Sequence, residues 1–145
     1  MKSTLGLLSI VGLCLLILSS VAGTESKTKK HRIVLEVTRD GTDQWNGVLN
    51  NVENVQKAFG AGQTQIEVVA HGNALGFLLT SNRVMQERMK SMADAGVVFA
   101  ACQNTMNRKN VTEKDLMPFV TTVDSGVAEV VRKQEDGWSY IKSGS

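Results

Sequence analysis

Short apolar runs alternate with amphipathic helical segments along the chain, and this alternation constrains the fold more than any other feature. The runs are continuously apolar instead of switching between polar and apolar residues. Continuous runs are typical of strands in a parallel sheet, because such strands are buried on both faces. The pattern therefore predicts an α/β protein, a three-layer sandwich around a mainly parallel five-stranded sheet.

The expected elements follow one another without internal repeats or proline-rich linkers, so residues 33–145 are predicted to form one domain. Strands are expected at residues 32–38, 65–72, 97–101, 119–123 and 138–142. Helices are expected at residues 43–59, 82–95 and 125–135, with a short helix that begins near Thr112 and ends before Pro118. Residues 103–110 are expected to form a polar loop.

The segment 73–81 is apolar but short, and Gly76 interrupts it. We expect a loop or a broken turn of helix that lies over the edge of the sheet. Residues 75–79 hold three leucines and Phe77, which is more apolar surface than so short a segment can bury in its own helix. These side chains are therefore expected to be exposed and to serve a homo-oligomer interface.

Residues 1–22 have the pattern of a cleavable secretory signal peptide. Lys2 precedes an apolar stretch, and the small residues Ser20 and Ala22 occupy the −3 and −1 positions of a cleavage site before Gly23. An uncleaved anchor is the alternative, because the apolar stretch approaches the length that spans a bilayer. The mature protein is expected to be periplasmic or secreted and free of membrane.

A basic, flexible tail is expected at residues 23–32, leading into the first strand. The formal net charge of the chain is only +2. Such a small charge gives no indication of nucleic-acid binding, so the basic residues of the tail are interpreted as solvated.

Cys102 is the only thiol left after signal cleavage, because the other cysteine, Cys14, lies inside the signal peptide. A free thiol at the end of a buried strand is a candidate reactive site. In parallel sheets, ligands and reactive groups gather beyond the carboxyl ends of the strands. Asp40, His71 and Cys102 each end an expected strand, so all three are predicted to lie along one edge of the sheet.

These residue types in this arrangement favour nucleophilic chemistry. The N–H groups at the start of a following helix favour a thiolate over a thiol, and His71 would add a proton acceptor or a positive charge. The catalytic candidates are thus Cys102 and His71. Asp40 and four neighbouring residues are predicted to complete a small-ligand site: Gly72, Asn73, Asn104 and Thr105.

Each of these residues also has a structural interpretation. Cys102 can be an inert buried cysteine, His71 a strand-end residue bonded to the next loop, and Asp40 a turn residue. A soft-metal site of Cys102, His71 and a methionine is a further alternative, although the methionine spacing suits a helix core face and two ligands are too few for structural zinc. No metal and no cofactor is expected. A nucleotide site in particular is not expected, because no glycine-rich phosphate loop follows the first strand.

Three stretches, VVAHGNALGFLL, GVVFAACQNTM and the region from NVTEKD to GWSYIK, resemble the DsrE/DsrF-like family of small sulfur-relay proteins. The most specific parts are the cysteine directly after the third strand and the closing series of Ser-Gly-Val, amphipathic helix, Gly-Trp and aromatic strand. The resemblance covers residues 33–142. It implies the five-stranded YchN-type α/β fold, a persulfide on Cys102, and assembly into trimers or hexamers.

The leading hypothesis is an exported sulfur-handling protein, similar to a sulfurtransferase or sulfur carrier, in which Cys102 accepts a sulfane sulfur and passes it to another thiol. His71 and the backbone near Asn104 and Thr105 would steady the thiolate, and a thiol or sulfur-donor protein would be the partner. The alternative is a non-catalytic oligomeric module that binds a small ligand or supports assembly. The two hypotheses differ in whether Cys102 is accessible and acidic.

Overall fold

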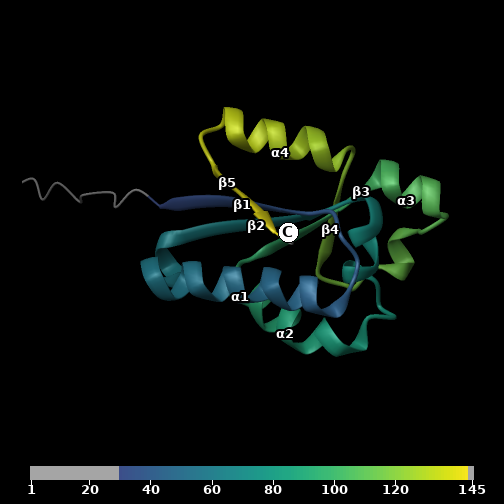
Figure 1. The fold of residues 1–145 in the computed structure, drawn as a ribbon, viewed down its shortest axis with the longest axis horizontal. Coiled ribbons are helices and arrows are strands. Elements are labelled where there is room, and N and C mark those ends of the chain that lie inside the picture. Colours follow the sequence, from purple (N-terminus) through teal and green to yellow (C-terminus); the bar gives the residue numbers. More distant parts are fainter. Residues whose placement is uncertain (1–29, 144–145) are drawn as a thin grey trace, which may run out of the picture.

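A sheet of five strands lies between two layers of helices in the computed structural model, which describes residues 30–143 (Figure 1). The strands are β1 (His31–Val37), β2 (Thr64–Ala70), β3 (Val98–Cys102), β4 (Val120–Val123) and β5 (Ser139–Ser143). The α-helices are α1 (Thr42–Phe59), α2 (Arg83–Asp94), α3 (Gln103–Lys109) and α4 (Gly126–Glu135). Three short 3-10 helices complete the elements: η1 (Ala61–Gln63), η2 (Gly72–Leu78) and η3 (Glu113–Asp115).

The strand order is β4-β3-β2-β1-β5, and each pair of neighbours is parallel. The predicted α/β fold class is therefore confirmed. The predicted signal peptide and residues 23–29 of the predicted basic tail lie outside the described residues, and the last two tail residues, His31 and Arg32, begin β1 instead. Within residues 30–143, no helix has both the length and the apolar character that crossing a membrane requires.

The direction of the strand order explains why α4 lies apart from α1 and α2. The chain steps from β1 to β4 toward one edge of the sheet, whereas β5 pairs with β1 at the other edge. The connection from β4 to β5 must therefore run back across the sheet, and the right-handed crossover rule puts a helix that travels in this direction on the opposite face. Figure 1 shows α4 on one side of the sheet and α1 and α2 on the other.

The two faces consequently carry cores of different size. The face under α1 and α2 holds the main core, in which Val48, Leu49 and Val52 of α1 are fully buried. The face under α4 has a small core of buried residues that one helix covers: Val34, Val69, Ala100 and Val130. Polar side chains are therefore better tolerated on the α4 face than under α1 and α2.

The predicted element boundaries agree with the structure within two residues, apart from the region after Cys102. Residues 103–110, expected as a polar loop, instead form α3, which ends at Asn110 in a left-handed conformation (φ 52°). The segment is polar in composition but amphipathic in arrangement, because Thr105 and Met106 are buried. The capping box predicted at Thr112 is present, with Asp115 as its partner.

The expectation that residues 75–79 expose their apolar side chains is wrong. Leu75, Phe77 and Leu78 of η2 are at most 1% exposed. The Phe77 ring packs against Trp45 and Phe99, with centroid distances of 5.7 and 6.2 Å. The segment buries its side chains in the main core instead of in a helix of its own, so it offers no apolar interface.

We predict that Phe77→Ala lowers the free energy of unfolding by about 3–5 kcal/mol, because it leaves a cavity in a closely packed core. The control is Val84→Ala on α2, whose side chain is 78% exposed and whose loss should cost at most about 0.5 kcal/mol. Chemical denaturation measures both. A Phe77→Ala variant of near wild-type stability but lower mass in solution would contradict the buried position.

Candidate functional site

Strand alternation and register bring polar side chains of β1, β2 and β3 to the face that α4 covers. Glu36 on β1 and Cys102 at the end of β3 lie on this face. The register of β2 and β3 ends with Ala70 opposite Ala101, so its continuation brings His71 beside Cys102. The carboxyl ends of β2 and β3 therefore hold the imidazole and the thiol as neighbours, as the sequence predicts.

The Cys102 side chain lies where two helices begin. Cys102 is the residue before α3, and Gly126, the first residue of α4, also faces its sulfur. The residue is only 4% exposed. Burial raises the pKa of the thiol, but the Thr105 hydroxyl and the backbone N–H groups of Gly126, Thr105 and Asn104 outweigh it and bring the pKa below its ordinary value of 9.0.

The hydrogen bonds of Thr105 determine which way its hydroxyl proton points. The hydroxyl oxygen accepts from the Gly72 N–H at 3.1 Å and from Arg108 Nη2 at 3.4 Å. A hydroxyl has two acceptor positions and one donor. With both acceptor positions in use, the proton is free to be donated to the Cys102 sulfur, and this bond favours the thiolate.

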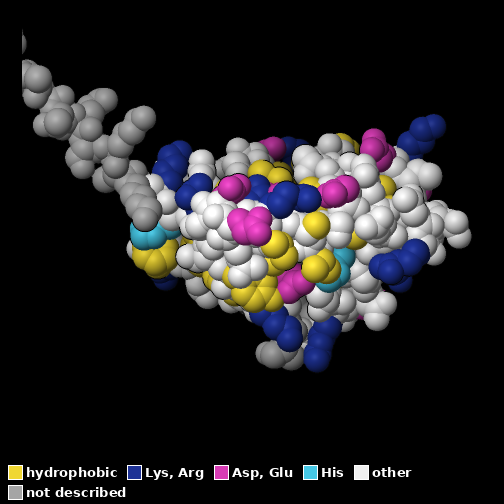
Figure 2. Space-filling model, turned by 90° about the horizontal axis from the view of Figure 1, so that it is seen from above, with side chains coloured by type: hydrophobic (Ala, Val, Ile, Leu, Met, Phe, Trp, Pro, Cys, Tyr) yellow, Lys and Arg dark blue, Asp and Glu magenta, His cyan; other side chains and the backbone are white. Residues whose placement is uncertain are grey.

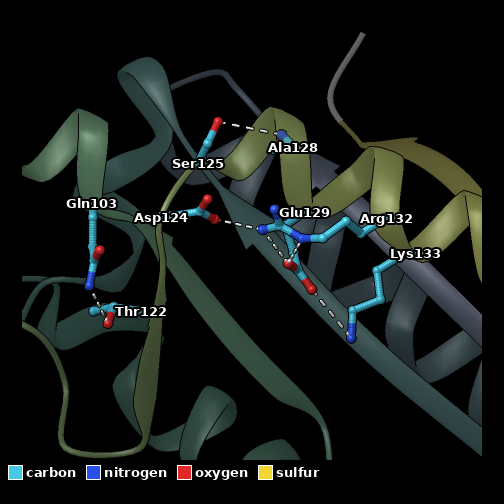
Figure 3. Close-up of polar contacts among 8 residues, drawn as sticks. All are labelled: Gln103, Thr122, Asp124, Ser125, Ala128, Glu129, Arg132 and Lys133. Carbon is cyan, nitrogen blue, oxygen red and sulfur yellow. Dashed lines mark hydrogen bonds and ion pairs between the residues drawn. The ribbon is translucent and has the colours of Figure 1, made fainter.

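Polar contacts around the starts of α3 and α4 hold these donors in place (Figure 3). Gln103 Nε2 donates to Thr122 Oγ1 on β4 at 3.1 Å, which ties the start of α3 to the neighbouring strand. Ser125 Oγ accepts from the Ala128 N–H at 3.4 Å and caps α4. Arg132 donates to Asp124 Oδ1 at 2.6 Å, so α4 is also fastened to the loop that precedes it.

His71 packs beside this cluster without bonding to the sulfur in the described structure. Its Nε2 lies 2.8 Å from Glu36 Oε1, and the other carboxylate oxygen accepts from the Tyr140 hydroxyl. Burial raises the pKa of Glu36, but its bonds to Tyr140 and His71 and the nearby charges of His71 and Lys142 bring it below the ordinary value. Glu36 in turn raises the pKa of Tyr140 to about 12.

The remaining predicted site residues are placed differently from one another. Gly72 takes part through its N–H bond to Thr105, in a left-handed conformation (φ 61°) that suits glycine. The Asn104 backbone lies beside the sulfur, and its N–H also donates to the Asp124 carbonyl oxygen at 3.3 Å. Asn73 is exposed on η2. Asp40 is exposed in the loop after β1, where its carboxylate accepts from the Gly41 N–H at 2.8 Å.

Sequence reasoning missed Glu36, Tyr140 and Gly126. Glu36 is the single carboxylate in the first apolar strand run, and a lone charge in such a run is a usable signal for a polar contact inside the fold. The sequence identifies Tyr140 only as a residue of the last strand and does not indicate its bond to Glu36. Gly126 belongs to the Ser-Gly-Val series that carried the family resemblance, but its contact with His71 depends on the packing of α4.

The arrangement can stabilise a thiolate. Among residues 30–143, no group of three or more His, Cys, Asp and Glu side chains is placed to hold a metal ion. Met85, Met89 and Met92, considered as soft ligands, are buried in the main core on the other side of the sheet. The groups that the site brings together are the Cys102 thiol and the neighbouring His71 imidazole.

Comparisons with known proteins agree with this fold. The model of the DsrE/DsrF-like family matches residues 13–143. MTH1491, a protein of unknown function from Methanobacterium thermoautotrophicum, is 29% identical, with a TM-score of 0.74 over 78% of this chain and 99% of its own. No curated protein matches the chain.

Two further solved structures share the fold at low identity. BT1422, a conserved protein of unknown function from Bacteroides thetaiotaomicron, is 16% identical, with a TM-score of 0.60 over 77% of this chain and 93% of its own. The ychN protein from E. coli is 11% identical, with a TM-score of 0.63 over 79% of this chain and 98% of its own. The latter confirms the expected YchN-type fold.

We predict that Thr105→Val slows alkylation of Cys102 at neutral pH about three- to tenfold, because the thiolate loses one charge-assisted hydrogen bond. Valine preserves the shape of the side chain. Thr64→Val is the matched control, because the Thr64 hydroxyl bonds Ala61 at the opposite end of the sheet. Equal rates for Thr105→Val and wild type would show that the hydroxyl does not act on the sulfur.

Proposed function

The chain belongs to the DsrE/DsrF-like family, and we propose that it handles sulfane sulfur through a persulfide on Cys102. The observation that carries this proposal is the cluster of donors around the sulfur, which lowers the pKa of a thiol that burial alone would raise. A thiolate is the nucleophile in sulfur chemistry, so its stabilisation near neutral pH is the property that the reaction needs.

The proposed reaction proceeds in two displacement steps without a cofactor. The Cys102 thiolate attacks the sulfane sulfur of a donor such as a polysulfide or thiosulfate, and a new S–S bond forms as the old bond breaks. The bonding electrons leave with the rest of the donor, as a shorter polysulfide or as sulfite. An acceptor thiolate then attacks the outer sulfur, and Cys102 leaves as a thiolate.

The same donors serve both steps. They stabilise the thiolate before the first displacement, and they stabilise it again as the leaving group of the second, because a thiol of lower pKa leaves faster. Cys102 is 4% exposed, which suits a small inorganic donor better than direct attack on a folded protein. The low exposure of Cys102 also favours the alternative hypothesis, in which the protein is a non-catalytic ligand-binding or assembly module.

Export is also part of the proposal. The signal peptide pattern of residues 1–22 supports it. Cleavage before Gly23 would remove Cys14 and leave Cys102 as the only cysteine. Any disulfide of the mature protein would then be intermolecular, either between two copies or with a thiol partner protein.

Assembly into a homo-oligomer stays a proposal. Because η2 is buried, the proposed interface now lies on the α4 side of the sheet. Val127 and Val131, one helical turn apart, are 57% and 46% exposed, and Tyr140 on β5 is 39% exposed. Figure 2 looks down on this side and shows hydrophobic side chains among charged ones. Covering them with a second copy would remove apolar surface from water.

The sulfur-loading test uses the mature protein and a polysulfide or thiosulfate donor. We expect intact mass to increase by one sulfur atom, a reductant to remove it, and Cys102→Ser to abolish the gain. His71→Ala should slow loading while the far-UV spectrum stays unchanged, because the ring contacts the Gly126 backbone. Alkylation of Cys102 only after denaturation would instead support the binding-module alternative.

The assembly test replaces Val127 and Val131 with aspartate. We expect light scattering to show a fall toward the monomer mass, because two charges would enter an apolar contact. Val84→Asp on α2 is the control, since Val84 is also exposed but lies on the other side of the sheet. A wild-type protein that is monomeric at about 50 μM, a concentration at which association should register, would contradict the proposal.

A further inference from the structure

Glu36, His71 and Gly126 form a line of contacts that ends at Cys102. Glu36 lies on β1, His71 follows β2, and Gly126 begins α4, so the line crosses three elements. The carboxylate bonds the imidazole at 2.8 Å, and the imidazole packs closely against Gly126. The Asn104 N–H donates to the Asp124 carbonyl oxygen at 3.3 Å, so the start of α4 lies against the start of α3, beside Cys102. The Gly126 N–H is also among the groups that lower the pKa of the thiol. Sequence patterns connect only His71 and Cys102 on this line.

The contact between His71 and Gly126 leaves no room for a side chain. A Cβ atom at position 126 would lie 3.0 Å from both Cβ and Cδ2 of His71 and 3.2 Å from Cγ. Distances this short force a shift of the ring or of the backbone. The position of the ring and the position of the first residue of α4 are therefore linked, and moving one displaces the other.

The carboxylate of Glu36 holds the ring from its other side. Its side chain is 18% exposed, and that of His71 is 17% exposed, so solvent screens the pair only in part. Tyr140 binds the second carboxylate oxygen, which keeps the carboxylate from turning away from His71. β1 is flanked by β2 and β5 in the sheet, so Glu36 is attached to an interior strand.

We propose that Glu36 is a positioning residue of the Cys102 site: its carboxylate fixes the His71 ring, and the ring sets the place from which the Gly126 N–H reaches the sulfur. The inference rests on the proposed function, because it assigns Glu36 to the same thiolate. Glu36 itself does not touch the sulfur. Its effect on Cys102 must therefore pass through His71, and this requirement makes the proposal testable.

The test compares the pH profile of Cys102 alkylation in wild type and Glu36→Leu. Leucine fills similar space but cannot hold the imidazole. We expect Glu36→Leu to reduce the rate about threefold at a pH below the thiol midpoint and to move the midpoint upward, because the Gly126 donor is less well placed. The alkylation midpoint of Glu36→Gln, which can still accept a bond from His71, should lie between those of wild type and Glu36→Leu. Glu53→Leu, which removes a carboxylate bound to Arg88, is the control.

A double-mutant cycle separates a path through His71 from any other path. In a His71→Ala background, Glu36→Leu should have no further effect, since the ring that transmits it is gone. If Glu36→Leu shifts the alkylation midpoint equally in the wild-type and His71→Ala backgrounds, the proposal is overturned. A Glu36→Leu variant that only loses thermal stability, with the wild-type pH profile, would overturn it as well.

Sulfur loading of the wild-type protein keeps this result distinct from the proposed function. If wild type gains sulfur and Glu36→Leu shows an unchanged pH profile, only the role of Glu36 is refuted. If wild type gains no sulfur, persulfide chemistry is refuted. The shift of the alkylation midpoint in Glu36→Leu then still decides for or against the positioning role.

Discussion

Burial and hydrogen bonding act in opposite directions on the Cys102 thiol, and their balance decides what this site can do. A cysteine that is 4% exposed in an apolar environment would be an inert packing residue. Here the Thr105 hydroxyl and backbone N–H groups at the starts of α3 and α4 lower the pKa of the thiol by more than burial raises it. The donors cost no rearrangement when the thiolate forms, because helix starts and strand ends already hold them. The balance thus turns a buried cysteine into a candidate nucleophile.

The fold supplies these donors through one topological constraint. Because β5 returns to the far edge of the sheet beside β1, α4 has to start above the end of β4 and cross the face opposite α1 and α2. Its first N–H group therefore reaches Cys102 at the end of the neighbouring β3. The same crossing leaves the α4 face thinly covered, which gives space for Glu36 and His71 between the sheet and the helix. A second helix on this face would have replaced them with apolar packing.

Much of this arrangement is readable from the sequence, and the exceptions have physical causes. Continuous apolar runs predicted the parallel sheet, and strand ends predicted that His71 and Cys102 are neighbours, since both follow from local pattern. The burial of Phe77 depends on its packing against Trp45 of α1 and Phe99 of β3, which no local pattern reveals. α3 was read as a loop because its composition is polar, although Thr105 and Met106 face inward. Glu36 meets His71 across the pairing of β1 with β2, and Tyr140 across the pairing of β1 with β5, so these contacts join residues 35 and 104 positions apart in the chain.

The central claim, that hydrogen bonding outweighs burial at Cys102, is tested most directly by titrating the thiolate absorbance of the mature protein and subtracting the Cys102→Ser signal. The account predicts a single midpoint below 9.0, the ordinary value for the thiol. The sign follows from the donors, which bind the thiolate better than the thiol, so the proton leaves at lower pH in the folded protein than in the unfolded chain. A midpoint above that value in the folded protein, returning to it on denaturation, would show that burial dominates and that Cys102 is a packing residue.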